Sequence, residues 1–316
     1  MTPMRVRAIE LRRKTPSIPY SLCYLAEGTD GTLAMIDPGT DLTGNWETLE
    51  RALAEEGRRM DDVALVICTH LHADHLGLAS RVREVSGAPI AIHAAEQQAI
   101  AALRGALERY AAELATWQVP DETAASVLAS FAGQDAESAL EADLLIEEDA
   151  SLPGAFSGLE TIWTPGHTPG HLCLVDRTGR RLFSGDHVLP EIVPGIGLGA
   201  PFETNAIASY LASLRRVAVF DGFDALPGHE HRFTGLAERI RTIRARHLRR
   251  TAEAAAIQAR IPGASVYEIA TALTWSRGFA NLAGRHLYSA LNQTALHLDF
   301  ASSTAYSDER DADAPR

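Results

Sequence analysis

The chain has 316 residues, of which 46% are hydrophobic, and its formal net charge is −12 at pH 7. This length and composition predict a globular protein with a sizeable core, and the acidic balance disfavours nucleic acid and anionic membrane surfaces as partners. Three scattered cysteines argue against a disulfide framework, and no apolar run is long enough for a signal core or a membrane span, so we expect a cytoplasmic protein.

The first part of the chain, from about residue 5 to 93, has the short apolar runs and turn residues of an α/β protein. In chain order it predicts strands at 20–25, 32–36 and 63–68 and helices at 45–57 and 76–86. Residues 94–149 are rich in alanine, glutamate and glutamine, with apolar residues three and four apart, which predicts a helical insertion.

Strand-like runs return after the insertion, at 159–163, 171–176, 181–183 and 223–226, and a helix is expected at about 205–216. Residues 234–300 have a helical pattern and predict a small C-terminal domain. The acidic, polar segment 301–316 is expected to be a disordered tail. The expected organisation is therefore a domain at 1–233 that carries the insertion, then the C-terminal domain and the tail.

Three histidines and an aspartate lie within six residues, in the sequence HLHADH at 70–75, directly after the apolar run 63–68. Packing explains them poorly, because each buried imidazole needs a polar partner. In extended backbone alternate side chains share a side, so His70 and His72 can converge on one metal ion, while the turn into the next helix presents Asp74 and His75 to another.

Three further candidate ligands each follow a strand-like run. His167 ends the sequence TPGH, Asp186 the sequence SGD and His229 the sequence PGH. Loops at one common edge of a sheet assembly could deliver these side chains to the same place as segment 70–75, with glycine and proline shaping tight turns.

Taken in order from Asp37 to His229, these motifs resemble those of the metallo-β-lactamase fold superfamily of hydrolases. The resemblance implies an α/β fold, a four-layer αββα sandwich, with two divalent metal ions in the site. It also implies the ligands: His70, His72 and His167 for one ion, Asp74, His75 and His229 for the other, and Asp186 for both. Asp37 would orient the histidine loop through hydrogen bonds.

Imidazole and carboxylate ligands suit zinc and do not exclude manganese or iron. Two such ions could hold a hydroxide that attacks a carbonyl, and could stabilise the oxyanion that forms. We count Asp74 and His187 as candidate catalytic residues, with His187 either a proton donor to the leaving group or a structural partner. His171 is expected to support the ligands by hydrogen bonding.

The expected substrate is a small ester, thioester or lactone. β-Lactamases of this superfamily usually lack an aspartate at the place of Asp186, whereas the sequence TPGHTPGH at 164–171 is similar to the motif of glyoxalase II-type thioesterases. Trp117, Phe131 and Phe202 could form apolar walls of a pocket, although ordinary helix packing explains them at least as well.

The helical insertion and the sequence SVYEIA at 265–270 resemble a subgroup with a small winged-helix-like C-terminal domain, which includes a ribonuclease. The basic run 239–250 would suit phosphate binding, so a metal-dependent ribonuclease is one alternative, although the overall charge disfavours nucleic acid. A non-catalytic winged-helix interaction protein is another, but it leaves seven ligands unexplained. A homodimer is compatible with the sequence.

Overall fold

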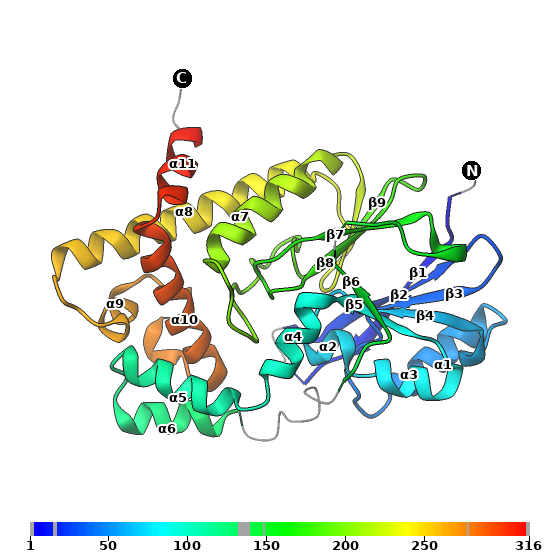
Figure 1. The fold of residues 1–316 in the computed structure, drawn as a ribbon, viewed down its shortest axis with the longest axis horizontal. Coiled ribbons are helices and arrows are strands. Elements are labelled where there is room, and N and C mark those ends of the chain that lie inside the picture. Colours follow the sequence, from blue (N-terminus) through cyan, green and yellow to red (C-terminus); the bar gives the residue numbers. More distant parts are fainter. Residues whose placement is uncertain (1–2, 15–17, 132–139, 148, 277, 314–316) are drawn as a thin grey trace.

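Two β-sheets stacked face to face organise the chain, and helices cover their outer faces (Figure 1). The computed structural model describes residues 3–14, 18–131, 140–147, 149–276 and 278–313. Within these residues the sheets hold six and four strands, in the orders β1-β2-β3-β4-β5-β6 and β10-β9-β8-β7. The expected four-layer αββα sandwich is confirmed.

The larger sheet is antiparallel at its start and parallel beyond. Its strands are β1 (Val6–Arg12), β2 (Tyr20–Glu27), β3 (Leu33–Ile36), β4 (Val63–Ile67), β5 (Ile90–His93) and β6 (Leu144–Ile146). The first three pair antiparallel, and β3 to β6 pair parallel. All four side chains of β3 are buried, which explains why its sequence is a continuous apolar run and does not alternate.

The smaller sheet consists of β7 (Leu159–Trp163), β8 (Leu172–Asp176), β9 (Arg181–Gly185) and β10 (Asp224–Pro227). Its strands are antiparallel except for the parallel pair of β9 and β10. Apolar side chains fill the space between the two sheets, among them Tyr24 and Ile36 from the larger sheet and Phe183 and Leu226 from the smaller one. Burial of this layer fixes the two sheets against each other.

Helices of both halves of the chain cover the outer faces. On the larger sheet lie α1 (Asn45–Glu55), α3 (Ala79–Ser86) and α4 (Ala94–Ala102), and on the smaller one α7 (Ala206–Val217) and α8 (Leu236–Arg260). Shorter pieces are α2 (Ala73–Leu76) and the 3-10 turns Met60–Asp62, Gly154–Phe156, Ala218–Phe220 and Phe279–Asn281. Each long helix buries an apolar stripe, as Leu49 and Leu53 of α1 do.

The predicted helical insertion at 94–149 is only partly helical. It contains α4, α5 (Ala106–Thr116) and α6 (Asp121–Ala129), but β6 then joins the parallel edge of the larger sheet beside β5. Residues 132–139 and 148 of the insertion lie outside the described residues. A strand of three residues is too short to show a period in the sequence, so the prediction missed it.

The C-terminal region contains α9 (Val266–Ala272), α10 (Gly284–Ala301) and α11 (Thr304–Asp313). Helices α5 and α6 of the insertion pack against α9 and α10, with Tyr110, Trp117 and Tyr288 in their shared core (Figure 1). No strand follows β10 in the described part of the chain, so the wing of a winged helix is not found there. The insertion and the C-terminal helices thus share one core.

The expected disordered tail is a helix over most of its length. Tyr306 of α11 packs against Phe300, with ring centroids 5.5 Å apart, and buried Glu309 accepts a hydrogen bond of 2.6 Å from Arg244. The prediction of disorder is therefore wrong for residues 304–313. The acidic composition of the segment gave no indication that Tyr306 and Glu309 would be buried against the rest of the protein. Across the described residues no helix combines the length and the apolar character needed to cross a membrane.

Candidate metal centre

The seven candidate ligands lie at one edge of the two sheets, five of them in loops and two, Asp74 and His75, in the short helix α2. The segment from His70 to His75 follows β4, Asp186 follows β9 and His229 follows β10. Because β9 and β10 are parallel, with Pro227 paired to Gly185, their next residues leave the sheet side by side. His167 comes from the turn between β7 and β8 and completes the set. Sheet topology therefore brings together residues far apart in sequence.

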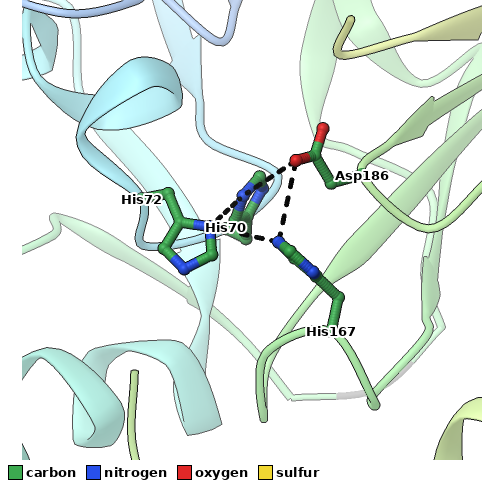
Figure 2. A group of neighbouring side chains, drawn as sticks. All are labelled: His70, His72, His167 and Asp186. Atoms are coloured by element: carbon green, nitrogen blue, oxygen red, sulfur yellow. Dashed lines mark hydrogen bonds and ion pairs between the residues drawn. The ribbon is translucent and has the colours of Figure 1, made fainter. Parts of the chain in front are cut away.

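Four of these side chains form a first group, which consists of His70, His72, His167 and Asp186. Figure 2 shows them turned toward a common point. His72 Nδ1 lies 3.0 Å from His70 Nε2 and 3.1 Å from His167 Nε2. Asp186 Oδ2 lies 3.7 Å from His167 Nε2 and 4.0 Å from His70 Nε2. Three imidazole nitrogens and one carboxylate oxygen thus converge as metal ligands do.

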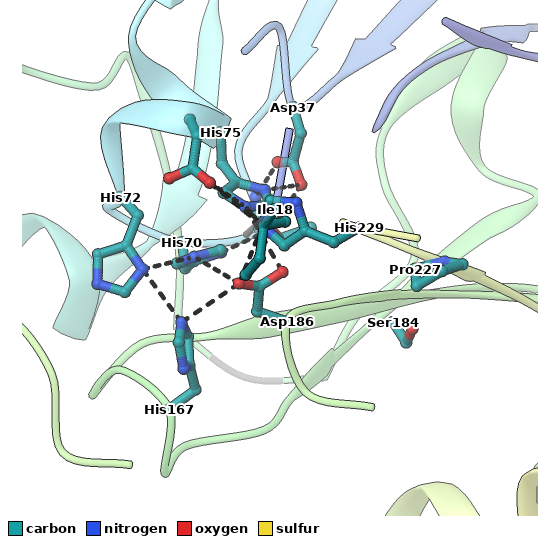
Figure 3. Close-up of polar contacts among 12 residues, drawn as sticks. Ile18, Asp37, His70, His72, His75, His167, Ser184, Asp186, Pro227 and His229 are labelled. Atoms are coloured by element: carbon teal, nitrogen blue, oxygen red, sulfur yellow. Dashed lines mark hydrogen bonds and ion pairs between the residues drawn. The ribbon is translucent and has the colours of Figure 1, made fainter. Parts of the chain in front are cut away.

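The remaining three, Asp74, His75 and His229, form a second group. His229 Nε2 lies 3.2 Å from Asp74 Oδ2 and 3.3 Å from His75 Nε2. Asp186 also faces this group, with its Oδ1 at 3.5 Å from His75 Nε2 and its Oδ2 at 3.4 Å from His229 Nε2 (Figure 3). Asp186 therefore stands between the two groups, which together could hold two metal ions.

For four of the five histidines, oxygen acceptors fix which ring nitrogen is turned to the centre. The Nδ1 atoms of four ligands face oxygens: His70 faces Thr69 Oγ1 at 3.0 Å, His75 Asp37 Oδ2 at 2.8 Å, His167 the Gly195 carbonyl at 2.7 Å and His229 the Tyr20 carbonyl at 2.9 Å. Each Nδ1 must carry the proton, so each Nε2 keeps the lone pair that a metal requires. Within the described residues Asp186 Oδ1 is buried without a hydrogen-bond donor, which also fits a cation.

Asp37 orients histidine ligands of both groups through its hydrogen bonds. It follows β3 with a φ of 53°, and its buried carboxylate accepts hydrogen bonds from the Thr69 backbone and hydroxyl, both at 2.7 Å, and from His75 Nδ1. Because the Thr69 hydroxyl donates to Asp37, it can only accept from His70 Nδ1. One carboxylate thereby orients a ligand of each group.

The electrostatic environment differs between the two groups. Burial, followed by the neighbouring His167, lowers the pKa of His72 to about 3, and burial with His75 and His72 holds the pKa of His70 well below its usual value. In the second group burial opposes protonation, but Asp186 and Asp74 raise the pKa of His229 to about 10. The first group thus offers neutral imidazoles, and the second has an excess of negative charge that favours a cation.

His171 and His187 occupy different places from the ligands. His171 Nε2 accepts from the Asp186 backbone at 3.1 Å, and its Nδ1 lies 2.8 Å from Thr164 Oγ1, so both nitrogens are engaged. The fully buried ring of His187 lies beyond His171, against Tyr210, and burial lowers the pKa of His187 to about 3. This buried neutral ring contacts His171 and Tyr210, which favours the structural role of His187 over that of a proton donor to the leaving group.

Glu96 of α4 is a buried carboxylate that the sequence interpretation missed. It accepts a hydrogen bond of 2.7 Å from the backbone N–H of Leu71, between two ligands, and one of 2.6 Å from that of Gly170, next to His171. Burial raises the pKa of Glu96 to about 7, against these two N–H groups, which stabilise the ionised form. Glu96 therefore ties two ligand loops together without facing the centre.

Close backbone approach at the end of β10 depends on glycine. A Cβ atom added to Gly228 would lie 2.5 Å from His75 Cε1 and 2.6 Å from Asp186 Oδ1. Any larger residue would displace a ligand from each group, so the glycine of the PGH sequence is needed for the second group to close.

The three aromatic residues expected as pocket walls separate in the structure. Trp117 and Phe131 pack in the shared core of the insertion and the C-terminal helices. Phe202 lines a cavity of about 370 Å³ together with Arg109, Tyr288 and Asp299, and none of the seven ligands lines this cavity. The wall interpretation therefore does not hold for Trp117 and Phe131, whose rings are used in helix packing.

Comparisons with known proteins agree with this geometry. The probable metallo-hydrolase YqjP of Bacillus subtilis (strain 168) is 24% identical over 306 residues, covering 92% of this chain and 91% of that protein. A beta-lactamase domain protein from Burkholderia ambifaria has a similar fold, with a TM-score of 0.76 and 23% identity over 93% of this chain and 86% of that one.

A metallo-beta-lactamase family protein from Thermus thermophilus is also similar, with a TM-score of 0.68 and 23% identity over 97% of this chain and 94% of that one. At this level of identity the two solved structures show a common fold. The family model of the metallo-beta-lactamase superfamily matches residues 19–229, a range that contains all seven candidate ligands, and the chain belongs to this superfamily.

Proposed function

We propose that the chain is a hydrolase with two metal ions that cleaves an ester, thioester or lactone of a small molecule. The observation that carries this proposal is the place of Asp186, which lies within 4.0 Å of histidine nitrogens from both groups. A single carboxylate between two sets of ligands suits a pair of ions a few ångströms apart, the arrangement found in many metal-dependent hydrolases.

Zinc is the proposed metal, because five imidazoles and two carboxylates form the set of ligands that zinc prefers. When bound, two divalent ions would lower the pKa of a water molecule, polarise a carbonyl and stabilise negative charge on its oxygen. This chemistry needs no nucleophilic side chain, and the buried Cys68 and Cys173 lie in packing positions.

The chain's own residues position these events. Asp37 and Thr69 hold His70 and His75 in the tautomer that leaves Nε2 available, and the Gly195 carbonyl does the same for His167. Asp186 contacts histidines of both groups and so holds the two groups beside each other. Because these contacts are preformed, the site loses little free energy to rearrangement when substrate binds.

Three of the six arginines in the basic run 239–250 hold internal contacts, which weakens the ribonuclease alternative. Arg239 donates to the carbonyls of Leu189 and Ile192, Arg244 bonds Glu309, and Arg250 bonds the Thr274 carbonyl. Guanidinium groups that hold internal contacts are not available to a phosphate backbone. A small carbonyl substrate is therefore the better proposal.

Metal analysis and a substrate panel test the proposal. We expect the purified protein to contain about two metal ions per chain and to hydrolyse at least one member of a panel of thioesters, lactones and simple esters, with RNA as the contrasting substrate. Asp186→Asn should lose metal and activity together. A protein without metal whose behaviour is unchanged by a chelator, or one that cleaves only RNA, would overturn the proposal.

A further inference from the structure

We propose that Arg13, in the turn between β1 and β2, forms an anion-binding subsite beside the second group and selects substrates that carry a carboxylate near the scissile carbonyl. The inference rests on the proposed function and narrows its substrate class to anionic esters, thioesters or lactones. Three observations carry it: the position of Arg13, its fixation by the hairpin, and the charge of the centre.

Arg13 reaches the metal centre directly. Its Nε lies 2.7 Å from Asp74 Oδ2, the oxygen that also faces His229 Nε2 at 3.2 Å. The side chains of Arg13 and Asp74 keep 17% and 14% of their surface exposed, whereas those of His70 and His75 have none. Arg13 therefore lies at the partly exposed edge of the buried centre, where a substrate group can reach it.

The hairpin holds this guanidinium in place. The backbone N–H of Arg13 donates to the Pro19 carbonyl at 2.8 Å and its Nη1 to the Ile18 carbonyl at 3.2 Å. The backbone carbonyl of the next residue, Tyr20, accepts from His229 Nδ1 at 2.9 Å, and the Tyr20 hydroxyl donates to the Glu230 carbonyl at 3.0 Å. In the view of Figure 3, Ile18 overlies the ligands. Arg13 is thus held by the segment that, through Tyr20, also contacts the loop of the ligand His229.

The forked guanidinium group of Arg13 has more N–H donors than its contacts to Asp74 and Ile18 use. Its contacts to Asp74 and Ile18 engage Nε and Nη1 within the described residues, and a guanidinium has five N–H donors in one plane. Asp74 can accept from Arg13 and still bind a metal, because a carboxylate offers about four lone pairs. The remaining N–H groups suit the two oxygens of a substrate carboxylate.

The charge of the loaded centre favours an anion. Asp37, Asp74 and Asp186 are the carboxylates in contact with the ligand histidines, and together with one hydroxide they would just balance two divalent ions. The positive charge of Arg13 at the same place is then left without a balancing negative charge. Opposite charges a few ångströms apart in a partly buried site attract strongly, so an anionic substrate group would balance the remaining positive charge.

Arg12 supplies a matched control. It precedes Arg13 at the end of β1, its side chain is exposed, and its backbone N–H donates to Asn45 Oδ1 at 2.8 Å. The exposed side chain of Arg12 therefore carries the same charge on the surface of the protein. Arg12→Gln and Arg13→Gln remove the same charge at neighbouring positions, and only the second removes the fork from the site.

The test compares 4-nitrophenyl butyrate with the mono-4-nitrophenyl ester of succinic acid, two esters with the same leaving group and acyl chains of four carbons. We expect the unmodified protein and Arg12→Gln to prefer the anionic ester in kcat/KM by about tenfold, the effect of one charge-assisted contact. Arg13→Gln should abolish this preference, mainly through KM for the anionic ester. Arg13→Lys, which keeps the charge without the fork, should retain part of it.

Equilibrium binding of succinate to the zinc-loaded protein, measured by calorimetry, gives a second readout. Arg13→Gln should weaken succinate binding about tenfold and Arg12→Gln should leave it unchanged. If the whole ester, thioester and lactone panel is inert, the proposed function fails, and the succinate measurement alone decides the subsite. Equal preference or equal succinate binding in Arg12→Gln and Arg13→Gln overturns the subsite, as does loss of metal from Arg13→Gln, which would make Arg13 a partner of Asp74 only.

Discussion

Glu96→Gln tests whether one buried carboxylate sets the geometry of two ligand loops. The change keeps the size of the side chain and removes its charge. One amide oxygen can still accept from Leu71 or Gly170, but the amide NH2 then faces the other backbone N–H, so two donors meet. The substitution therefore damages the link between the loops and leaves the ligands themselves intact.

The contacts of Glu96 set the expected magnitude. A hydrogen bond to a charged group contributes about 1.5–3 kcal/mol and an unpaired buried donor costs about 1–3 kcal/mol, so the free energy of unfolding of the metal-free protein should fall by about 2–4 kcal/mol. Removal of a group that orients metal ligands typically costs about 10–100-fold in metal affinity. Because Leu71 lies between His70 and His72, and Gly170 close to His167, the first group should lose affinity most.

Two assays separate the effects, with Asp176→Asn as the control. Asp176 is also a buried carboxylate, accepts from the Gly179 backbone at 2.8 Å and pairs with Arg181, but its contacts lie at the turn after β8, away from the ligands. At about pH 8.5, above the pKa of Glu96, its carboxylate is ionised; there urea unfolding of the metal-free proteins measures stability, and competition with a zinc-binding dye measures metal affinity. If both variants lose similar stability and neither loses zinc affinity, Glu96 is only a structural residue and the reasoning is refuted.

Three further outcomes are expected. Removal of metal by a chelator should lower the unfolding temperature, and zinc should restore it, since a ligand at about 1,000 times its Kd stabilises by about 4 kcal/mol. Burial lowers the pKa of His247 to about 4, so the folded state resists protonation of this residue and loses stability as pH falls below 6.5. The free energy of unfolding of the unmodified protein should therefore fall between pH 7.5 and 5. His247→Leu should make this fall smaller by about 2 kcal/mol, measured by urea unfolding. Gly166→Ala should lower the free energy of unfolding by more than about 2 kcal/mol in the same assay, because the φ of Gly166 is 143° and the added Cβ would lie 2.4 Å from Tyr210 Cβ. An unchanged unfolding midpoint would show that Tyr210 can move aside.

The ligands were predictable because their signal is local. Three histidines and an aspartate within segment 70–75 are improbable as packing, and the TPGH, SGD and PGH sequences each place a polar residue just past a strand. The structure brings all seven side chains together. Asp37 also had a local cue in its DPG turn, and it does contact His75.

The remaining residues of the site carry no local cue. Glu96 is one glutamate in an alanine-rich helix, and its partners lie 25 and 74 residues away. Arg13 belongs to a basic run that is typical of a solvated surface. His187 was assigned to the chemistry because it follows Asp186, yet the chain turns at these two residues and the ring of His187 faces Tyr210. The roles of these three residues follow from their contacts in the folded structure, and their neighbours in the sequence did not predict those contacts.

The helices outside the common sandwich take part in the metal centre through one loop. The Gly195 carbonyl orients His167, and the N–H groups at 197 and 198 donate to the carbonyls of Gly166 and His167 at 2.8 and 2.9 Å. The same loop is held from its other side by Arg109 of α5, which donates to the Gly199 carbonyl at 3.1 Å, and by Asn292 of α10, which donates to the Gly197 carbonyl at 2.7 Å. Because the insertion and the C-terminal region both bond the loop that fixes a ligand, we expect a change in either region to reach the metal centre through His167 without altering any of the seven ligands.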